Sequence, residues 1–400
     1  MPRKLRIAIV GGGIGGAALA ASLHQRGFTP HIFERAAAFG EIGAGVQMTP
    51  NAVKVLRALG LYDRMIKSAF QPEAAVGRNW KTGKQTFYMP FDKRFIALYD
   101  APYLQIHRAD LLNLFTSHLP DSMMSFGRIV TGCRNVDDGA VLTFDDGTTY
   151  EADLVIGADG VRSTVREKLF GDSNPRWTGH VCYRALVPVD GLVDYVAPYN
   201  SVWMGRNSHV VTYYVRSGHA VNIVAVLEAE NWVEEGWSVP ATRDELLHAF
   251  KDWHPDILTL FSNVTETYRW GLFDRDPMQS WNSGCVTLLG DAAHPMLPFL
   301  SQGAAMAIED GFVLAGALAA TPDNVPEALA RYEAERRPRT SRVQLESRRR
   351  GETYHLPSPL AQIRRDIEYR IRSLVAPKTG GMRADWIYEY DGVAAVRSFR

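Results

Sequence analysis

The stretch Ile7–Gly16, IAIVGGGIGG, decides the fold class of this 400-residue chain. The apolar run Leu5–Val10 predicts a short buried strand, and the glycines that follow predict a tight turn. A helix is expected from about Ile14 to Arg26, and a second strand over His31–Glu34. Strand, turn, helix and strand in this order form a βαβ unit. The unit predicts an α/β protein that opens with a Rossmann-like domain.

The glycines of this stretch are spaced to bind a dinucleotide. Gly11 allows the tight turn, Gly13 lets the backbone approach a pyrophosphate, and Gly16 lets the helix pack closely on the strand. The helix N-terminus offers free N–H groups and the positive end of its dipole to the anion. Glu34 ends the second strand, where its carboxylate can bind ribose hydroxyls and would repel a 2′-phosphate. The motif predicts FAD or NAD rather than NADP, although a glycine turn of this kind can also be purely structural.

A second segment, Gly290–Pro295 (GDAAHP), distinguishes between these dinucleotides. It follows a buried strand predicted over Cys285–Leu289 and precedes a predicted helix. Asp291, directly beyond the strand, can bind the hydroxyl groups of a ribityl chain. Gly303, at the start of the helix, lets backbone N–H groups face the carbonyl groups of a flavin. The helix dipole then stabilises the negative charge of the reduced flavin, so these residues favour FAD.

A third segment, IGADGVRSTVR, contains Asp159 and Gly160, and by itself it suits a turn before a helix equally well. Together the three segments make the chain resemble the single-component (class A) FAD-dependent aromatic hydroxylases, which have the p-hydroxybenzoate hydroxylase fold. The resemblance extends from Ile7 to about Arg350. Within this class the chain is most similar to the salicylate, 3-hydroxybenzoate and 6-hydroxynicotinate monooxygenases, which share the character of GAGVQMTPN at residues 43–51.

The resemblance implies FAD as cofactor, NADH or NADPH as reductant, and O₂ activation through a flavin C4a-hydroperoxide. It also implies roles for individual residues: Val130 lies near the adenine, Asp159 near the pyrophosphate, and Pro295 roofs a dry pocket over the flavin. The full set of implied cofactor-binding residues is Gly11, Gly13, Gly15, Gly16, Glu34, Arg35, Arg108, Val130, Asp159, Asp291, Pro295, Gly303 and Ala304.

The composition changes between His180 and Leu227, where apolar, β-branched and aromatic runs predict an antiparallel sheet of a separate lobe. We therefore expect a discontinuous FAD-binding domain made of residues 1–75, 100–175 and 276–370. An inserted, mainly antiparallel substrate domain takes 76–99 and 176–275, and 371–400 is a C-terminal extension. The C-terminal helices are expected to pack on the FAD-binding domain.

The segment Arg206–Tyr214 is the most informative part of the substrate lobe. On a strand, His209 and Tyr213 share one face. In the 6-hydroxynicotinate type, a histidine and a tyrosine at this spacing line the substrate pocket. A base beside a phenol favours the more reactive phenolate, and a histidine of near-neutral pKa suits that task. Both residues are therefore predicted to be catalytic and to bind substrate, although a histidine at a strand start can also be a packed core residue.

Other pocket positions depart from these relatives. The 6-hydroxynicotinate type carries histidines where this chain has Gln47 and Phe299, and a 3-hydroxybenzoate type has a glutamine where it has Pro298. Gln47 and Pro298 are still expected to contact the substrate, so its identity stays open. No metal is predicted, because His294 has no partner at ligand spacing.

Bulk composition limits the partners of the chain. The formal net charge is zero, which points neither to nucleic acid nor to an acidic membrane surface. The basic residues between Arg336 and Arg350 alternate with acids, which predicts a solvated helix face. Three scattered cysteines fit a reducing compartment, and the glycines at 11–16 argue against a secretory signal. Apart from the N-terminus, no stretch is expected to be apolar and long enough to span a membrane, so we expect a cytoplasmic protein. We also expect it to be a monomer or a homodimer.

These observations predict an enzyme that hydroxylates a phenolic or hydroxypyridine aromatic acid with NAD(P)H and O₂. Two alternatives stay open. One is a related flavoprotein oxygenase or reductase for a larger, non-aromatic substrate, and the other is a flavin-binding sensor without turnover. The sequence leaves open the exact substrate, the position hydroxylated, NADH against NADPH, and whether the substrate loses its carboxylate.

Overall fold

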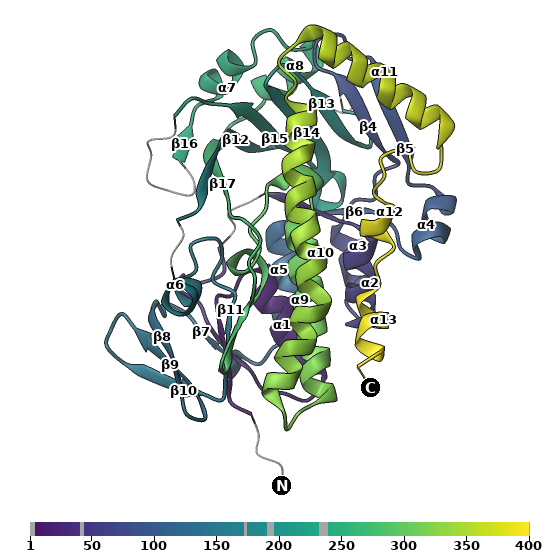
Figure 1. Ribbon diagram of the computed structural model, residues 1–400. Coiled ribbons are helices and arrows are strands. Elements are labelled where there is room, and N and C mark those ends of the chain that lie inside the picture. Colours follow the sequence, from purple (N-terminus) through teal and green to yellow (C-terminus); the bar gives the residue numbers. More distant parts are fainter. Residues whose placement is uncertain (1–4, 41–43, 172–173, 190–195, 232–238, 400) are drawn as a thin grey trace.

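The computed structural model describes residues 5–40, 44–171, 174–189, 196–231 and 239–399. Two large sheets lie one above the other, and the long helix α10 (Val325–Tyr354) runs beside both of them (Figure 1). The predicted α/β class is therefore confirmed, with a Rossmann-like lower part and a β-sheet upper part.

The lower sheet contains the predicted βαβ unit. Its strand order is β18-β19-β11-β1-β2-β7. β1 (Ile7–Val10) is buried along its whole length and pairs in parallel with β11 (Leu154–Gly157) and β2 (His31–Phe33). Helix α1 (Ile14–Gln25) follows the glycine turn and ends one residue earlier than predicted. The remaining strands are β7 (Met124–Ser125), β18 (Asn282–Ser283) and β19 (Val286–Leu288).

The upper sheet has eight strands in the order β16-β17-β12-β15-β14-β13-β4-β5. Its pairs are antiparallel, as predicted, except that β13 and β4 run parallel. The strands are β4 (Ala74–Asn79), β5 (Gln85–Pro90), β12 (Arg176–Pro188), β13 (Tyr199–Met204), β14 (Ser208–Val215), β15 (Ala220–Glu228), β16 (Val239–Ala241) and β17 (Thr267–Asp274). Because β4 and β5 join this sheet, they favour the proposed division of the chain, whose residue boundaries stay a prediction.

The remaining described strands form two smaller sheets. The pair β3 (Gly45–Met48) and β6 (Leu104–His107) lies against the upper sheet, where the Gly45 N–H donates to Asn222 Oδ1 at 2.7 Å. The strands of the other are β8 (Val130–Val136), β9 (Gly139–Phe144) and β10 (Thr149–Ala152). The shorter helices are α2 (Pro50–Ala58), α3 (Tyr62–Ser68), α4 (Lys93–Tyr99), α5 (Arg108–Thr116), α6 (Thr164–Phe170), α7 (Arg243–Ala249), α8 (Pro255–Ser262), α12 (Asp385–Tyr388) and α13 (Gly392–Arg397).

Helix α9 (Gly303–Ala320) is the central helix of the lower part and packs between α1 and α10. A Cβ atom on Gly311 would lie 2.7 Å from the backbone nitrogen of Leu19, so a glycine is needed for α1 and α9 to approach this closely. The expectation that no further stretch is long and apolar enough to span a membrane is wrong for α9. It passes that test by length and composition, but 78% of it is buried inside the protein, as in a core helix.

Helix α11 (Pro359–Val375) corrects a second expectation. The helices α10 and α13 pack on α9, as predicted for the C-terminal helices. In contrast, α11 covers β5 of the upper sheet, where Ser373 Oγ accepts a hydrogen bond from the Tyr88 backbone N–H at 3.2 Å. The chain can cross from one part to the other because α10 is long enough to lie beside both (Figure 1).

Candidate active site

A cavity of about 450 Å³ lies between the two parts of the molecule. Its lower wall contains the first turn of α1, the start of α9, and the loop around Asp291. Its upper wall contains β3, β13 and β14, with the end of α10 at one side. The predicted site residues that line it are Gly13, Gly15, Gln47, Arg108, His209, Tyr213, Asp291, Pro298, Gly303 and Ala304.

The N-termini of two helices converge on the lower wall. Gly13 precedes α1 and Gly303 begins α9, and neither helix has a side-chain cap at its start. A Cβ atom built on either glycine would meet no other atom within 4 Å. The free N–H groups and positive dipole ends therefore face open space, which suits a pyrophosphate at one helix and an electron-rich flavin ring at the other. The lower wall thus fits FAD.

Two further glycines of the first turn have structural roles. The φ angle of Gly11 is +103°, a conformation that residues with a side chain rarely adopt. A Cβ atom on Gly16 would lie 2.0 Å from the carbonyl oxygen of Gly11, so only glycine lets α1 pack this closely after β1. These contacts agree with the roles predicted for both residues, and they apply with or without a bound nucleotide.

Asp291 and Arg108 both line the cavity. Asp291 lies in the short turn Gly290–Ala292 directly beyond the strand that was predicted to present it. Burial raises the pKa of Asp291, and the nearby charges of His294 and Arg108 act in the opposite direction. Burial, with Arg184 nearby, lowers the pKa of Arg108. A carboxylate and a guanidinium held here can bind hydroxyl and phosphate groups respectively.

Besides Gly11 and Gly16, five predicted cofactor-binding residues do not line the cavity: Glu34, Arg35, Val130, Asp159 and Pro295. Glu34 accepts hydrogen bonds from the backbone N–H groups of Gly12, at 2.6 Å, and Ala36, at 2.9 Å. Its carboxylate therefore orders the glycine turn itself. Arg35 is exposed on the surface beside it. Val130 belongs to the hydrophobic core, and its strand follows Arg128, whose backbone N–H donates to the Glu34 carbonyl.

Asp159 has a structural contact of its own. Its carboxylate accepts hydrogen bonds from Ser163 Oγ at 2.5 Å and from the Val165 N–H at 3.2 Å, at the start of α6. Burial raises the pKa of Asp159, while these hydrogen bonds oppose the rise. The neighbours Ala158 and Gly160 line the cavity, but Asp159 does not. Pro295 is also off the wall, and its carbonyl accepts from Gln344 Nε2 at 3.0 Å.

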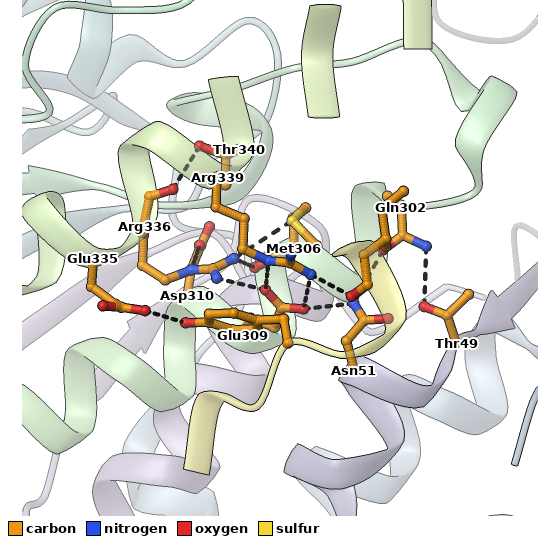
Figure 2. A network of polar contacts seen from close by, with 12 residues as sticks. Thr49, Asn51, Gln302, Met306, Glu309, Asp310, Glu335, Arg336, Arg339 and Thr340 are labelled. Atoms are coloured by element: carbon orange, nitrogen blue, oxygen red, sulfur yellow. Dashed lines mark hydrogen bonds and ion pairs between the residues drawn. The ribbon is translucent and has the colours of Figure 1, made fainter. Parts of the chain in front are cut away.

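A buried network of ion pairs holds the lower wall in place (Figure 2). Arg336 of α10 contacts Glu309 at 2.6 Å and Asp310 at 2.8 Å, and all three side chains are fully buried. Asp310 also contacts His294 Nε2 at 2.6 Å, which fixes the loop that carries Asp291. Arg339 adds a second cation at 2.9 Å from Glu309. The network thus connects α9 and α10 to the segment Gly290–Pro295, here named the flavin loop.

The sequence pattern does not reveal this network. It predicts a solvated face for the basic residues of α10, which is wrong for Arg336, a residue with 0% exposure. A signal was present, because Glu309 and Asp310 are two adjacent acids in an otherwise apolar helix. Buried carboxylates require partners of opposite charge, so the pair should have predicted buried arginines nearby.

Strand β14 forms part of the upper wall, and alternate residues along it face the cavity, as predicted. His209, Val211 and Tyr213 all face the cavity. Val210 and Tyr214 face the other way, into the hydrophobic cluster under α7 and α8. The aromatic residues Tyr103 and Phe299 also line the cavity, whereas Trp203 packs in that cluster.

Hydrogen bonds between side chains orient the polar groups of the upper wall. The Gln47 amide is held by Asn200, at 3.1 and 3.2 Å, and by the Tyr103 hydroxyl, which donates to Gln47 Oε1. A Cβ atom on Gly45 would lie 2.5 Å from the Tyr213 ring, so this glycine leaves room for the tyrosine. The polar edge of the wall is therefore fixed before any ligand binds.

His209 has a partner that the sequence did not reveal. Its Nδ1 lies 2.6 Å from Nε2 of His355, and His355 Nδ1 lies 3.6 Å from Glu228 Oε1. Burial, with His180 nearby, lowers the pKa of His209 to about 3, so the near-neutral pKa that we expected is wrong. His209 is neutral at physiological pH. The predicted absence of a metal stays untested, since His180, Glu228 and His355 offer ligand atoms within 4.8 Å of one another.

Comparisons with known proteins agree with this geometry. A family model described as FAD binding domain matches residues 4–347. A 3-amino-4-hydroxybenzoate 2-monooxygenase of Streptomyces platensis is 40% identical over 362 residues, which cover 90% of this chain and 91% of that protein. A 6-hydroxynicotinate 3-monooxygenase of Pseudomonas fluorescens is 39% identical over 350 residues, covering 86% and 90%. A solved salicylate hydroxylase substrate complex superimposes with a TM-score of 0.84 at 29% identity, covering 99% of this chain and 98% of the other.

Proposed function

The chain belongs to the FAD-binding family of flavin-dependent aromatic monooxygenases, and from this premise we propose that it hydroxylates a phenolic or hydroxypyridine carboxylic acid with NADH or NADPH and O₂. The observation that carries the proposal is the placement of His209 and Tyr213 on one wall of a cavity whose other wall fits FAD. Bound FAD would accept a hydride and activate O₂, which is chemistry that protein side chains do not supply.

The hydrogen bond between His209 and His355, together with the Glu228 carboxylate 3.6 Å beyond it, favours one tautomer of His209. The Glu228 carboxylate favours a proton on the facing nitrogen of His355, Nδ1, which leaves His355 Nε2 as an acceptor. His209 then donates through Nδ1–H, and its Nε2 is free to accept a hydrogen bond from a substrate hydroxyl. The arrangement makes His209 a base that is oriented toward the substrate ring.

The low pKa of His209 limits when it takes a proton. An isolated imidazolium is unfavourable in this buried position, so His209 stays neutral until a substrate hydroxyl lies beside it. Transfer of the phenolic proton would form an imidazolium and a phenolate in contact, and each ion stabilises the other. A phenolate ring is richer in electrons and reacts faster with an electrophilic oxygen.

Other residues of the cavity orient the substrate and exclude water. The fixed Gln47 amide and the Tyr213 hydroxyl supply hydrogen bonds at defined positions on the upper wall. Val202, Val211 and Phe299 are apolar parts of the lining. A dry lining protects reactive oxygen species from water and strengthens the polar contacts that remain. Pro298, three residues after the flavin loop, lines the cavity and can contact the substrate there.

A substrate panel tests the proposal. Purified holoenzyme is mixed with NADH or NADPH and with 3-hydroxybenzoate, 6-hydroxynicotinate, 3-amino-4-hydroxybenzoate or salicylate. Oxidation of the nicotinamide, O₂ uptake and hydroxylated product are then measured. We expect at least one acid to stimulate all three in equal amounts. If none does, and a larger non-aromatic compound is converted instead, the alternative of a related oxygenase or reductase replaces this proposal.

The proposal also covers the oligomeric state and the cellular location of the enzyme. We infer a cytoplasmic enzyme that acts without nucleic acid or membrane, as a monomer or a homodimer. The three cysteines are free thiols, in keeping with a reducing compartment. Exposed apolar side chains follow the outer face of α11, which favours the homodimer: Leu360, Ile363, Ile367, Ile371 and Leu374. Light scattering on the purified enzyme distinguishes the two states.

A further inference from the structure

Arg350 lies where the main cavity meets a second one. The second cavity, of about 620 Å³, lies between the end of α10, α11 and the segment 381–387. Both cavities are lined by Arg350, together with Leu300, Met382, Ala384 and Ile387. The guanidinium lies 5.9 Å from the centre of the Tyr354 ring, and its Nη2 donates a long hydrogen bond, 3.5 Å, to the Met382 carbonyl. Arg350 thus forms part of the boundary between the two spaces.

Among the residues that the structure describes, the charge of Arg350 has tyrosines as neighbours and no carboxylate partner. In the part of the chain that the structure describes, its near neighbours each contact a carboxylate: Arg348 contacts Asp274 at 2.5 Å, Arg349 contacts Glu346 at 2.7 Å, and Arg365 contacts Asp366 at 2.9 Å. Arg350 contacts none in those same ranges, and phenol rings surround it instead. A guanidinium keeps its charge at any physiological pH, and leaving such a charge unpaired inside a protein is costly. The position therefore favours an anionic ligand.

Arg350 and His209 are close enough to act on one small molecule. Both contact the same side chain, because the His209 ring lies 5.2 Å from the Tyr354 ring. Both also line the main cavity. An aromatic acid carries a hydroxyl group and a carboxylate on one ring, and a base and a guanidinium are the groups that bind these two substituents.

We propose that Arg350 binds the carboxylate of the substrate through its planar guanidinium while His209 faces the hydroxyl group. The second cavity is then the route by which the acid approaches, since six arginines and only three glutamates line it, and Arg364 and Arg383 among these arginines are exposed. This inference rests on the proposed function and names the residue that makes an acid the preferred substrate.

Arg184 is the competing anchor. It also lines the main cavity, but it lies beside the Trp270 ring, at 5.7 Å, and near Arg108 on the cofactor side. An acid bound there would place its carboxylate toward the flavin. An acid bound to Arg350 would instead have its aromatic ring between its carboxylate and the lower wall of the cavity.

The test compares an acid with its uncharged amide. The probes are 3-hydroxybenzoate with 3-hydroxybenzamide, and 6-hydroxynicotinate with its carboxamide. Their dissociation constants are measured from the change in flavin absorbance of the holoenzyme, and kcat and KM from nicotinamide oxidation. The variants are Arg350→Met, Arg350→Lys and Arg184→Met. The control is Arg337→Met, which removes the same charge from α10 at a side chain paired with Glu333 and outside both cavities.

Arg350→Met should weaken binding of the acid about 100-fold and leave binding of the amide within about threefold, so the preference for the acid is lost. Arg350→Lys should keep part of the preference, because a lysine supplies the charge without the planar fork. Arg337→Met should match the wild type. If Arg350→Met does not bind FAD, the lysine variant carries the test alone.

Two results would overturn the inference. One is an unchanged preference for the acid in the Arg350 variants, and the other is loss of that preference in Arg184→Met alone. In both, the wild type still hydroxylates an acid, so only the anchor is wrong. If the wild type neither binds nor converts any aromatic acid, the proposed function fails first and the anchor falls with it.

Discussion

Arg336 and Arg350 lie on the same helix, α10, but their guanidinium groups have opposite surroundings. Arg336 is fully buried and contacts two carboxylates, Glu309 and Asp310, in the network under the flavin loop (Figure 2). Arg350 opens onto two cavities, and it contacts no carboxylate within the described ranges of the chain. A paired interior charge stabilises the fold around it. An unpaired one is left to bind something that the chain does not contain, and the two arginines can therefore be tested against each other.

Replacing Arg336 should have the largest effect. Arg336→Met leaves Glu309 and Asp310 buried without their main counter-ion, which should lower the free energy of unfolding by about 3–5 kcal/mol. Arg350→Met abandons no buried carboxylate, so it should change that free energy by less than about 1 kcal/mol. Urea unfolding of both variants measures the difference. Equal losses for the two would contradict the distinction between paired and unpaired charges.

Removing the proposed base, His209, tests the function of the cavity, and the quantity measured is activity instead of stability. His209→Ala should lower kcat for a hydroxylated product about 100-fold, within the range for loss of a general base. Because burial lowers the pKa of His209 to about 3, wild-type kcat should show no titration of this residue between pH 5 and pH 8. The pH profile of kcat, measured on wild type and variant, checks both statements.

The controls for this experiment come from the same wall. Val211→Ala, two residues along β14, also removes atoms from the cavity lining but carries no proton. Its product yield per nicotinamide oxidised is expected to fall less than that of His209→Ala. An inflection near pH 6.5 that is present in the wild type and absent from His209→Ala would show that the histidine is more exposed than its surroundings suggest.

The parts of this molecule that sequence patterns predicted are local ones. IAIVGGGIGG determines a strand, a turn and a helix over adjacent residues, and the alternation along β14 correctly placed His209 and Tyr213 on one wall. Local patterns could not place Arg350 at the cavity or His355 behind His209, because both residues lie at the end of a helix that begins far from β14 in the sequence. The same limit explains why the sequence wrongly predicts that Arg336 is exposed. Its partners lie on α9, and the spacing of charges along α10 does not reveal them.

The paired region should also respond to acid. Burial would raise the pKa of Asp310, but His294 and Arg336 together lower it below its ordinary value. A carboxylate with a depressed folded pKa stabilises the protein above its unfolded pKa of about 3.9, and this contribution is lost as pH falls through the folded value. The free energy of unfolding should therefore decrease below about pH 4 by roughly 1–2 kcal/mol more in the wild type than in Asp310→Asn. Parallel curves for the two proteins in urea unfolding at pH 3–6 would show that Asp310 makes no such contribution.

The smallest expected effect concerns the route to the unpaired arginine. Arg364 and Arg383 are exposed residues at the second cavity, and neither contacts a carboxylate in the part of the chain that the structure describes. Exposed charges steer a ligand and contribute little to its final affinity. The double variant Arg364→Gln/Arg383→Gln should lower kcat/KM for an aromatic acid about two- to threefold at low ionic strength, with kcat unchanged. The difference from the wild type should vanish in 0.5 M salt, at which charges are screened within about 4 Å. A loss of kcat/KM that persists in salt would exclude electrostatic steering by these two arginines. The acid would then reach Arg350 by direct contact with them or by another path.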